Sequence, residues 1–199
     1  HLIEKHTDSA ILKTPQSNFK VNEKNRLLRI IHEYVNLERK RDYFEVVETE
    51  SASEVNIEGL KFSTRIDRMD RMASGSKIII DYKTGKNVKA SHLTGDPLEQ
   101  AQLPIYAITN SVEGVAFAII NSNNCEFKAI TKNKLELPLS KQASNKMPDW
   151  DNQVTEWTSS LTMASQDFQA GVASVSPTKH ACDYCDYDLL CRIEKPGNN

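Results

Sequence analysis

The chain has 199 residues, of which 39% are hydrophobic and 26% are charged, and its formal net charge is −2. This is the composition of an ordinary globular domain with a sizeable core, and it excludes a strongly basic protein that holds nucleic acid through its global field. No apolar run reaches the roughly 18 residues of a membrane span, and no signal peptide is recognisable. We therefore expect a cytoplasmic protein with no membrane partner.

The N-terminal part of the sequence predicts one helix and one strand. The chain begins with His1 rather than Met, so we expect a fragment of a longer protein. Residues 1–21 show little periodicity and form an N-terminal segment for which no structure is predicted. Apolar side chains then recur at helical spacing and predict an amphipathic helix over residues 22–41; a lone histidine on such a helix, here His32, is more often structural than a ligand. Residues 44–50 alternate apolar and acidic side chains and predict the first strand.

The stretch 59–86 predicts a β-hairpin. Residues 60–70 and residues 77–83 both alternate in character, as the two faces of a strand require. The segment between them, residues 73–76, is Ala-Ser-Gly-Ser, which is small and turn-prone.

This hairpin brings two carboxylates together. If the turn is centred on Ser74, Asp67 and Asp81 are cross-strand neighbours on one face, with Cβ atoms about 5 Å apart. Lys83 is two residues beyond Asp81 and shares its face, because side chains alternate along a strand. The sequence therefore predicts a cluster of two acids and one amine.

Such a cluster suits a particular chemistry. Two adjacent carboxylates raise one another's pKa unless a cation lies between them, and Mg²⁺ is commonly bound through one or two carboxylates plus water and substrate phosphate. The ammonium of Lys83 can orient a metal-bound water or help to deprotonate it, as in metal-assisted phosphodiester hydrolysis. An edge hairpin with solvated charges remains the structural alternative. Asp70 faces the other side of the strand and is expected to pair with Arg68 or Arg71.

The pattern I-D-R-x-D, followed by a hydrophobic strand that ends D-Y-K-T-G, resembles the PD-(D/E)XK nuclease superfamily. It is most similar to the RecB/AddB-type nuclease domains of bacterial recombination and DNA-repair proteins. The resemblance implies that Asp67 and Asp81 bind Mg²⁺ or Mn²⁺ together with the backbone carbonyl of Tyr82, and that Lys83 is the catalytic lysine. Thr64 stands where the family usually has glycine.

The resemblance extends to residues before the hairpin. It implies a functional role for Glu50, which matches a glutamate at the end of the family's first strand. The family's site also includes a His or Glu on a helix before that strand, usually in a G-x-x-x-H context. Neither His1 nor His6 has this context, so the element is unassigned.

A second helix is predicted after the hairpin. Asp96-Pro97-Leu98-Glu99 has the residues of a helix N-terminus, and Gln102 and Tyr106 lie four apart and so share a face. This pair resembles the family's Q-x-x-x-Y motif. The resemblance implies that both side chains border the active site and the DNA path, and we expect them to point toward Asp81 and Lys83 rather than into the core. The alternative is a packed helix with two polar surface groups.

The remaining elements read as core. Residues 114–120 are almost continuously apolar and predict a strand buried on both faces, and residues 125–130 predict its partner, with Cys125 as a small buried residue. A helical stripe ended by Gly171 predicts a long packed helix. Its positions are Trp150, Val154, Trp157, Leu161, Ala164 and Phe168.

The C-terminal tail, residues 176–199, contains Cys182, Cys185 and Cys191 in the spacing C-x2-C-x5-C. Closely spaced thiols in a reducing compartment argue against disulfides and suit an iron–sulfur cluster or zinc. The tail resembles the cysteine triple of AddB-type proteins and of CRISPR-associated iron–sulfur nucleases. This implies a [4Fe–4S] cluster in the full-length protein, with a fourth cysteine upstream of the fragment. A zinc site completed by His180, or three free thiols, remain alternatives.

Together these features predict an α/β fold with a restriction-endonuclease-like core, in which helices flank a mixed central sheet over residues 22–175 and a cysteine-containing tail follows. The function implied is a Mg²⁺-dependent DNA exonuclease domain of a recombination or repair protein. Its partners are DNA and a helicase–nuclease subunit or a helicase-like region of the same longer chain. The alternatives are a non-catalytic nuclease-like DNA-binding or scaffolding module and a free-standing CRISPR-associated iron–sulfur exonuclease.

Overall fold

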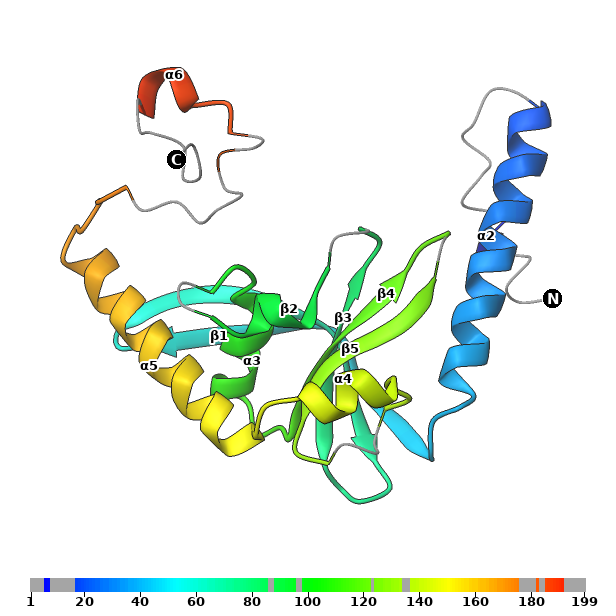
Figure 1. Cartoon of the computed structure of the whole chain (residues 1–199), viewed down its shortest axis with the longest axis horizontal. Coiled ribbons are helices and arrows are strands. Elements are labelled where there is room, and N and C mark those ends of the chain that lie inside the picture. Colours follow the sequence, from blue (N-terminus) through cyan, green and yellow to red (C-terminus); the bar gives the residue numbers. More distant parts are fainter. Residues whose placement is uncertain are drawn as a thin grey trace.

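The computed structural model describes residues 6–7, 17–85, 88–95, 98–122, 124–133, 137–175, 182 and 185–191. A five-stranded sheet in the order β1-β2-β3-β4-β5 forms its centre (Figure 1). The strands are β1 (Phe44–Ile57), β2 (Leu60–Met72), β3 (Lys77–Lys83), β4 (Gly114–Ile120) and β5 (Cys125–Thr131). The helices are α2 (Ser17–Glu38), η1 (Ala90–Leu93), α3 (Gln102–Thr109), α4 (Lys141–Lys146), α5 (Trp150–Gln169) and α6 (Asp188–Cys191).

The sheet is mixed. β3 and β4 pair in parallel, and the other neighbours pair antiparallel. A parallel pair needs a crossover connection, and the segment containing η1 and α3 supplies it. Helices flank this sheet, so the predicted α/β fold class with a mixed central sheet is confirmed.

The two faces of the sheet carry separate cores because successive strand residues point to opposite sides. Ile79 and Phe117 lie on the face covered by α3 and α5, in a cluster that also contains Tyr106 and Trp157. The opposite face carries Ile78, Ile80, Ala116, Ala118 and Phe127, and packs against Ile30 and Leu37 of α2. β4 is buried along almost its whole length, as the apolar sequence predicted.

β1 is longer than predicted, and the prediction that it ends at Glu50 is wrong. It continues to Ile57 and pairs with β2 through the Glu58-Gly59 turn. Both turn residues have positive φ, 48° and 88°, which is the backbone of the two-residue turn that matches strand twist. The second half of β1 is mostly polar, so hydrophobic periodicity did not reveal it.

Three helix boundaries also differ from the prediction. α2 begins at Ser17 and ends at Glu38, a few residues before the predicted limits. α3 begins at Gln102 rather than near Asp96, since the backbone N–H of Gln100 donates to the His92 carbonyl and is not part of a helix. Asp96 and Pro97 lie outside the described residues.

The long helix α5 follows its predicted stripe at Trp150, Trp157 and Leu161, which are buried, and Gly171 ends it with φ of 72°. The last two predicted positions are wrong, since Ala164 is exposed and Phe168 is 70% exposed, and Ser165 is buried instead. No helix in the described part of the chain combines the length and the apolar character that crossing a bilayer requires.

Candidate active site

The two predicted acids meet where β2 and β3 separate. The strands pair from Arg71↔Lys77 to Arg68↔Ile80, and one further step of the same register would place Asp67 opposite Asp81. The backbone ladder ends there, and the Asp67 carboxylate takes its place: Oδ2 accepts a hydrogen bond from the backbone N–H of Tyr82 at 3.0 Å. The structure thus brings together the carboxylates that the sequence placed on one hairpin.

Asp81 is the buried member of this pair. It is 3% exposed and stands beside Phe117 in the parallel ladder with β4. Burial raises the pKa of its carboxyl, and the ammonium of Lys83 offsets part of this effect while the charge of Asp67 adds to it. The protein holds Asp81 in a place where its charge is costly.

Lys83 lies within reach of this carboxylate. Its Nζ is 2.8 Å from Asp81 Oδ2 and 5.7 Å from the centre of the Phe117 ring. The amine lies off the direction of a good hydrogen bond, so among the described residues Asp81 Oδ2 has no hydrogen-bond partner. A buried carboxylate oxygen without a hydrogen bond is unusual, and the charge of Asp67 acts on the same carboxyl group.

These residues fit a hard divalent cation. Carboxylate oxygens are the ligands that Mg²⁺ and Mn²⁺ prefer, and an ion would satisfy the buried Asp81 oxygen. In the described ranges no three His, Cys, Asp or Glu side chains converge on one point. This agrees with the way Mg²⁺ binds, since it usually keeps several waters and takes only one or two protein carboxylates. A role for the Tyr82 carbonyl remains a prediction.

A buried ionic cluster supports the site from the opposite face of the sheet. The Arg68 guanidinium binds both oxygens of Asp70, at 2.6 and 2.8 Å, and donates to Glu38 at 3.0 Å and to the Tyr82 hydroxyl at 3.1 Å. Arg41 completes it with an ion pair to Asp70 at 2.7 Å. Arg68 follows Asp67 on β2, and Tyr82 lies between Asp81 and Lys83 on β3. The hydrogen bond between Arg68 and Tyr82 therefore joins the two strands that carry the candidate site.

The charges of this ionic cluster are matched. The side chains of Arg41 and Asp70 are 0% exposed. Burial by itself would raise the pKa of Glu38, but the Tyr34 hydroxyl and the two arginines bring it below its usual value. Burial would likewise lower the pKa of Arg68, yet Asp70 and Tyr82 raise it. Each arginine of the cluster is therefore paired with carboxylates, which is how buried charges are tolerated, and only Arg41 Nε lacks a hydrogen-bond partner among the described atoms of the cluster.

The sequence anticipated only part of this cluster. The expected pairing of Asp70 with Arg68 is confirmed, whereas Arg71 pairs with Glu45 at 3.0 Å. Arg41 was missed as a partner of Asp70. Its position four residues after the buried Leu37, in line with the apolar stripe of the helix predicted over residues 22–41, was the signal that could have identified it, although α2 itself ends at Glu38.

Gln102 and Tyr106 contact β2. The Tyr106 hydroxyl donates to the Arg65 carbonyl at 2.6 Å, and the Gln102 amide donates to that hydroxyl at 3.2 Å. The expectation that Tyr106 lies outside the core is wrong, since its ring is 2% exposed and packs in the core under α3 and α5. The pair holds β2 two residues before Asp67.

Glu50 lies on β1, between residues that pair with Arg68 and Ile66, and so opposite Asp67. It has a positive φ of 49°, and its carboxylate is 64% exposed and pairs with Arg65 at 3.0 Å. Its functional role remains a prediction. His32 is exposed on α2.

The tail cysteines are not assembled into a site in the described residues. Cys185 and Cys191 are exposed and Cys182 is half-buried. The backbone N–H of Cys185 approaches the Cys182 carbonyl at 3.5 Å, and that of Cys191 donates to the Tyr187 carbonyl. His180, the alternative zinc ligand, lies outside the described residues. A cluster at these cysteines therefore remains a prediction. Cys125 is buried, as predicted.

Comparisons with known proteins identify one family. The family model of the PD-(D/E)XK nuclease superfamily matches residues 2–192. No curated protein matches the chain. Among solved structures, the one titled "Crystal structure of SSO0001" is 16% identical, covers 96% of this chain and 94% of its own, and superposes with a TM-score of 0.42.

Proposed function

The chain belongs to the PD-(D/E)XK nuclease superfamily, and from this premise we propose that it is a Mg²⁺- or Mn²⁺-dependent deoxyribonuclease with its reaction centre at Asp67, Asp81 and Lys83. The observation that carries the proposal is the Asp81 carboxylate, which is buried beside a second acid and whose Oδ2 meets the Lys83 ammonium in an ion pair at 2.8 Å but has no hydrogen-bond partner among the described residues. A buried acceptor without a hydrogen bond costs free energy, and a bound cation would offset that cost.

Each residue has a distinct task in this proposal. Asp67 and Asp81 would hold the ion, with the Tyr82 carbonyl as a further ligand. A bound divalent ion polarises the phosphoryl group and lowers the pKa of water. Lys83, whose side chain is 26% exposed, reaches from Asp81 toward solvent and orients the attacking water. Its positive charge also favours the phosphate of the substrate.

The finer proposal concerns the biological context. The resemblance of I-D-R-x-D, D-Y-K-T-G and Q-x-x-x-Y to RecB/AddB-type domains supports an exonuclease that acts in bacterial recombination or repair. DNA is then the substrate, and the partner is a helicase–nuclease subunit or a helicase-like region of a longer chain. The same resemblance supports a [4Fe–4S] cluster at Cys182, Cys185 and Cys191.

The test is cleavage of end-labelled linear DNA, single- and double-stranded, in Mg²⁺ and in excess chelator. Asp81→Asn and Lys83→Met should each lower the rate on the order of 10³-fold, which corresponds to several kcal/mol of lost transition-state stabilisation. Asp151 and Lys132 form an exposed acid–amine pair at 3.0 Å on the same protein, so Asp151→Asn and Lys132→Met are matched controls and should leave the rate unchanged.

Two outcomes contradict the proposal. Cleavage that persists in chelator, or in Asp81→Asn, would show that another site or a contaminant carries the activity. DNA binding without cleavage by the wild-type protein would instead favour the non-catalytic DNA-binding module.

A further inference from the structure

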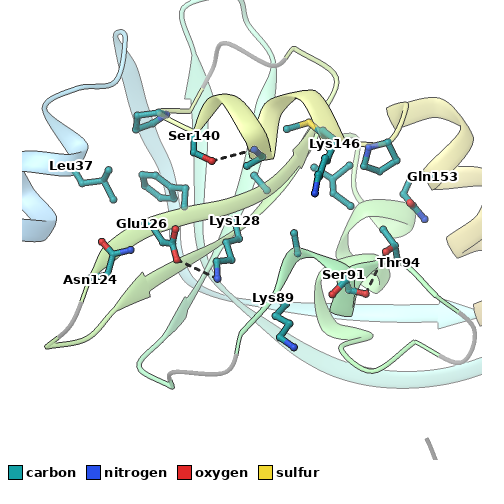
Figure 2. Close-up of a pocket in the computed structure, with 18 of the residues that line it drawn as sticks. Leu37, Lys89, Ser91, Thr94, Asn124, Glu126, Lys128, Ser140, Lys146 and Gln153 are labelled. Atoms are coloured by element: carbon teal, nitrogen blue, oxygen red, sulfur yellow. Dashed lines mark hydrogen bonds and ion pairs between the residues drawn. The ribbon is translucent and has the colours of Figure 1, made fainter. Parts of the chain in front are cut away.

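β5 is the last strand of the sheet, so β4 is its only strand partner among the described residues. A cavity of about 790 Å³ runs along this strand, and residues 124–130 all contribute to its lining (Figure 2). None of Asp67, Asp81 and Lys83 lines it. The cavity is therefore a feature separate from the candidate active site.

The outer edge of β5 presents unpaired backbone groups to this cavity. Lys132 donates its backbone N–H to the carbonyl of Glu113, the residue before β4, and Gly114↔Thr131 is the next pair in the ladder. Since antiparallel residues alternate between facing the partner and facing away, Phe127 and Ala129 direct their N–H and C=O groups outward. Thr131 follows the same alternation, because its N–H reaches the Met147 sulfur at 3.3 Å.

The two ends of this edge differ. Met147 blocks the end at Thr131, and the described structure gives the outward groups of Phe127 and Ala129 no backbone partner. An exposed strand edge of this kind is a template for the addition of another strand. The open part, from Cys125 to Ala129, matches an extended segment of about five residues.

The side chains around the edge are apolar next to the strand and basic at the rim. Leu37, Met147 and Pro148 contribute apolar walls. In Figure 2, Lys146 extends from α4 on one side of β5, and Lys89 extends from the segment just before η1 on the other side. Both lysines are exposed and form no ion pair with any described residue. The single acid in the lining, Glu126, is already paired with Lys128 at 3.2 Å.

We propose that this groove binds an extended acidic peptide segment, which adds to β5 as a further strand. The unpaired N–H and C=O groups of Phe127 and Ala129 select a peptide backbone, and the two rim lysines select carboxylates. A nucleic-acid strand would use the lysines but would leave the strand edge unpaired, so the backbone groups favour a peptide. The site lies on a different strand from the nuclease centre and does not depend on its activity.

The first test uses a capped, fluorescein-labelled heptapeptide of alternating glutamate and valine, with binding to the intact chain followed by fluorescence anisotropy. The matched peptide has the same side chains but N-methyl groups on alternate backbone amides, which remove the strand donors and leave the charge. We expect saturable binding of the first peptide and at least tenfold weaker binding of the second. Equal binding of the two peptides, or no binding of either at 1 mM, overturns the proposal.

Protein variants test whether the charges of the two rim lysines contribute to peptide binding. Lys89→Glu combined with Lys146→Glu should weaken binding of the heptapeptide about tenfold, as expected for two exposed charge pairs. Lys132→Glu is the control, since this exposed lysine is paired with Asp151 and lies outside the groove. An unchanged affinity in the double variant, or displacement of the peptide by a short single-stranded oligonucleotide with the same lysine dependence, contradicts the assignment to a peptide.

Amide hydrogen exchange locates the binding. In the free protein the amides of Phe127 and Ala129 should exchange faster than those of Lys128 and Ile130, which face β4. The peptide should slow Phe127 and Ala129 selectively. If these two amides are already as protected as Lys128 in the free protein, the edge is covered and the groove cannot accept a strand.

Discussion

The Asp67 carboxylate accepts a hydrogen bond from the backbone N–H of Tyr82 at 3.0 Å, at the point where backbone pairing between β2 and β3 stops. The Asp67 side chain thus adds one hydrogen bond to the end of the backbone ladder between β2 and β3, and it places a negative charge beside Asp81. The hydrogen bond is structural, and the charge is the part that a metal ion would use. Substitutions can separate these two contributions.

Asp67→Asn should preserve the fold and abolish cleavage. The asparagine oxygen can still accept from Tyr82, whereas Asp67→Ala leaves that N–H without its acceptor and should lower the free energy of unfolding by about 1 kcal/mol. Both variants should lose Mg²⁺-dependent cleavage. Thermal unfolding in chelator and a DNA cleavage assay measure the two effects. If the Asp67→Asn variant cleaves DNA at the wild-type rate, Asp67 is not a ligand of the metal ion.

Asp81→Asn should stabilise the metal-free protein at neutral pH. The folded state raises the pKa of Asp81 above its ordinary value of 3.8, chiefly through burial. As the pH rises above 3.8 the unfolded chain therefore loses this proton first, and the wild-type protein loses stability that the asparagine variant keeps. The difference in melting temperature between variant and wild type should shrink toward zero as the pH falls below 3.8.

Added Mg²⁺ should reverse this order, because an ion that binds only the folded wild type stabilises it by mass action. Asp151→Asn, at an exposed position, should show neither effect. An Asp81→Asn variant that melts below the wild type in chelator at neutral pH would show that the Lys83 ion pair outweighs the cost of burial.

Glu38→Gln should destabilise the protein and flatten its acid denaturation. The pKa of Glu38 lies below its ordinary value of 4.5 in the folded state, so its stabilising contribution is present above pH 4.5 and is lost as the pH falls through the folded pKa. Breaking a buried ionic cluster at one partner costs on the order of 3 kcal/mol. Urea unfolding from pH 7 to pH 3 measures both effects.

The control for this substitution is Glu45→Gln, whose exposed carboxylate pairs with the exposed Arg71. It should stay within about 0.5 kcal/mol of the wild type, as surface ion pairs do. A Glu38→Gln variant with the wild-type pH profile would show that the ionic cluster does not depend on the Glu38 charge.

The cysteine tail is tested by metal content. Full-length protein purified without oxygen should contain iron and sulfide and absorb broadly near about 400 nm if Cys182, Cys185 and Cys191 ligate a [4Fe–4S] cluster. Cys185→Ser should remove the absorbance, whereas Cys125→Ser, at a buried position on β5, should not. Stoichiometric zinc without iron would show that the cysteines bind zinc rather than a cluster. If neither metal is found, the three cysteines are free thiols.

Some of the site was predictable from the sequence because its parts are local. Ser74 and Gly75 lie in the short turn between β2 and β3, and a short turn sets the register of the strands it joins. The alternation of side chains then places Lys83 on the face of Asp81. The hairpin and the buried strand Gly114–Ile120 were predicted on this basis, and the sheet confirms both.

Other features depend on residues far apart in the chain. Three features exist only once α2, α3 and the sheet have packed: the ion pair between Arg41 and Asp70, the hydrogen bond from the Tyr106 hydroxyl to the Arg65 carbonyl, and the burial of the Asp81 carboxylate. Periodicity records the neighbours of a residue along its own element and carries no information on which element will cover it. By itself the sequence determined which side chains are the candidates for the chemistry and which strands hold them. Their burial and their support from the opposite face of the sheet were decided by tertiary packing, since desolvation and ion pairing depend on distance in space rather than distance along the chain.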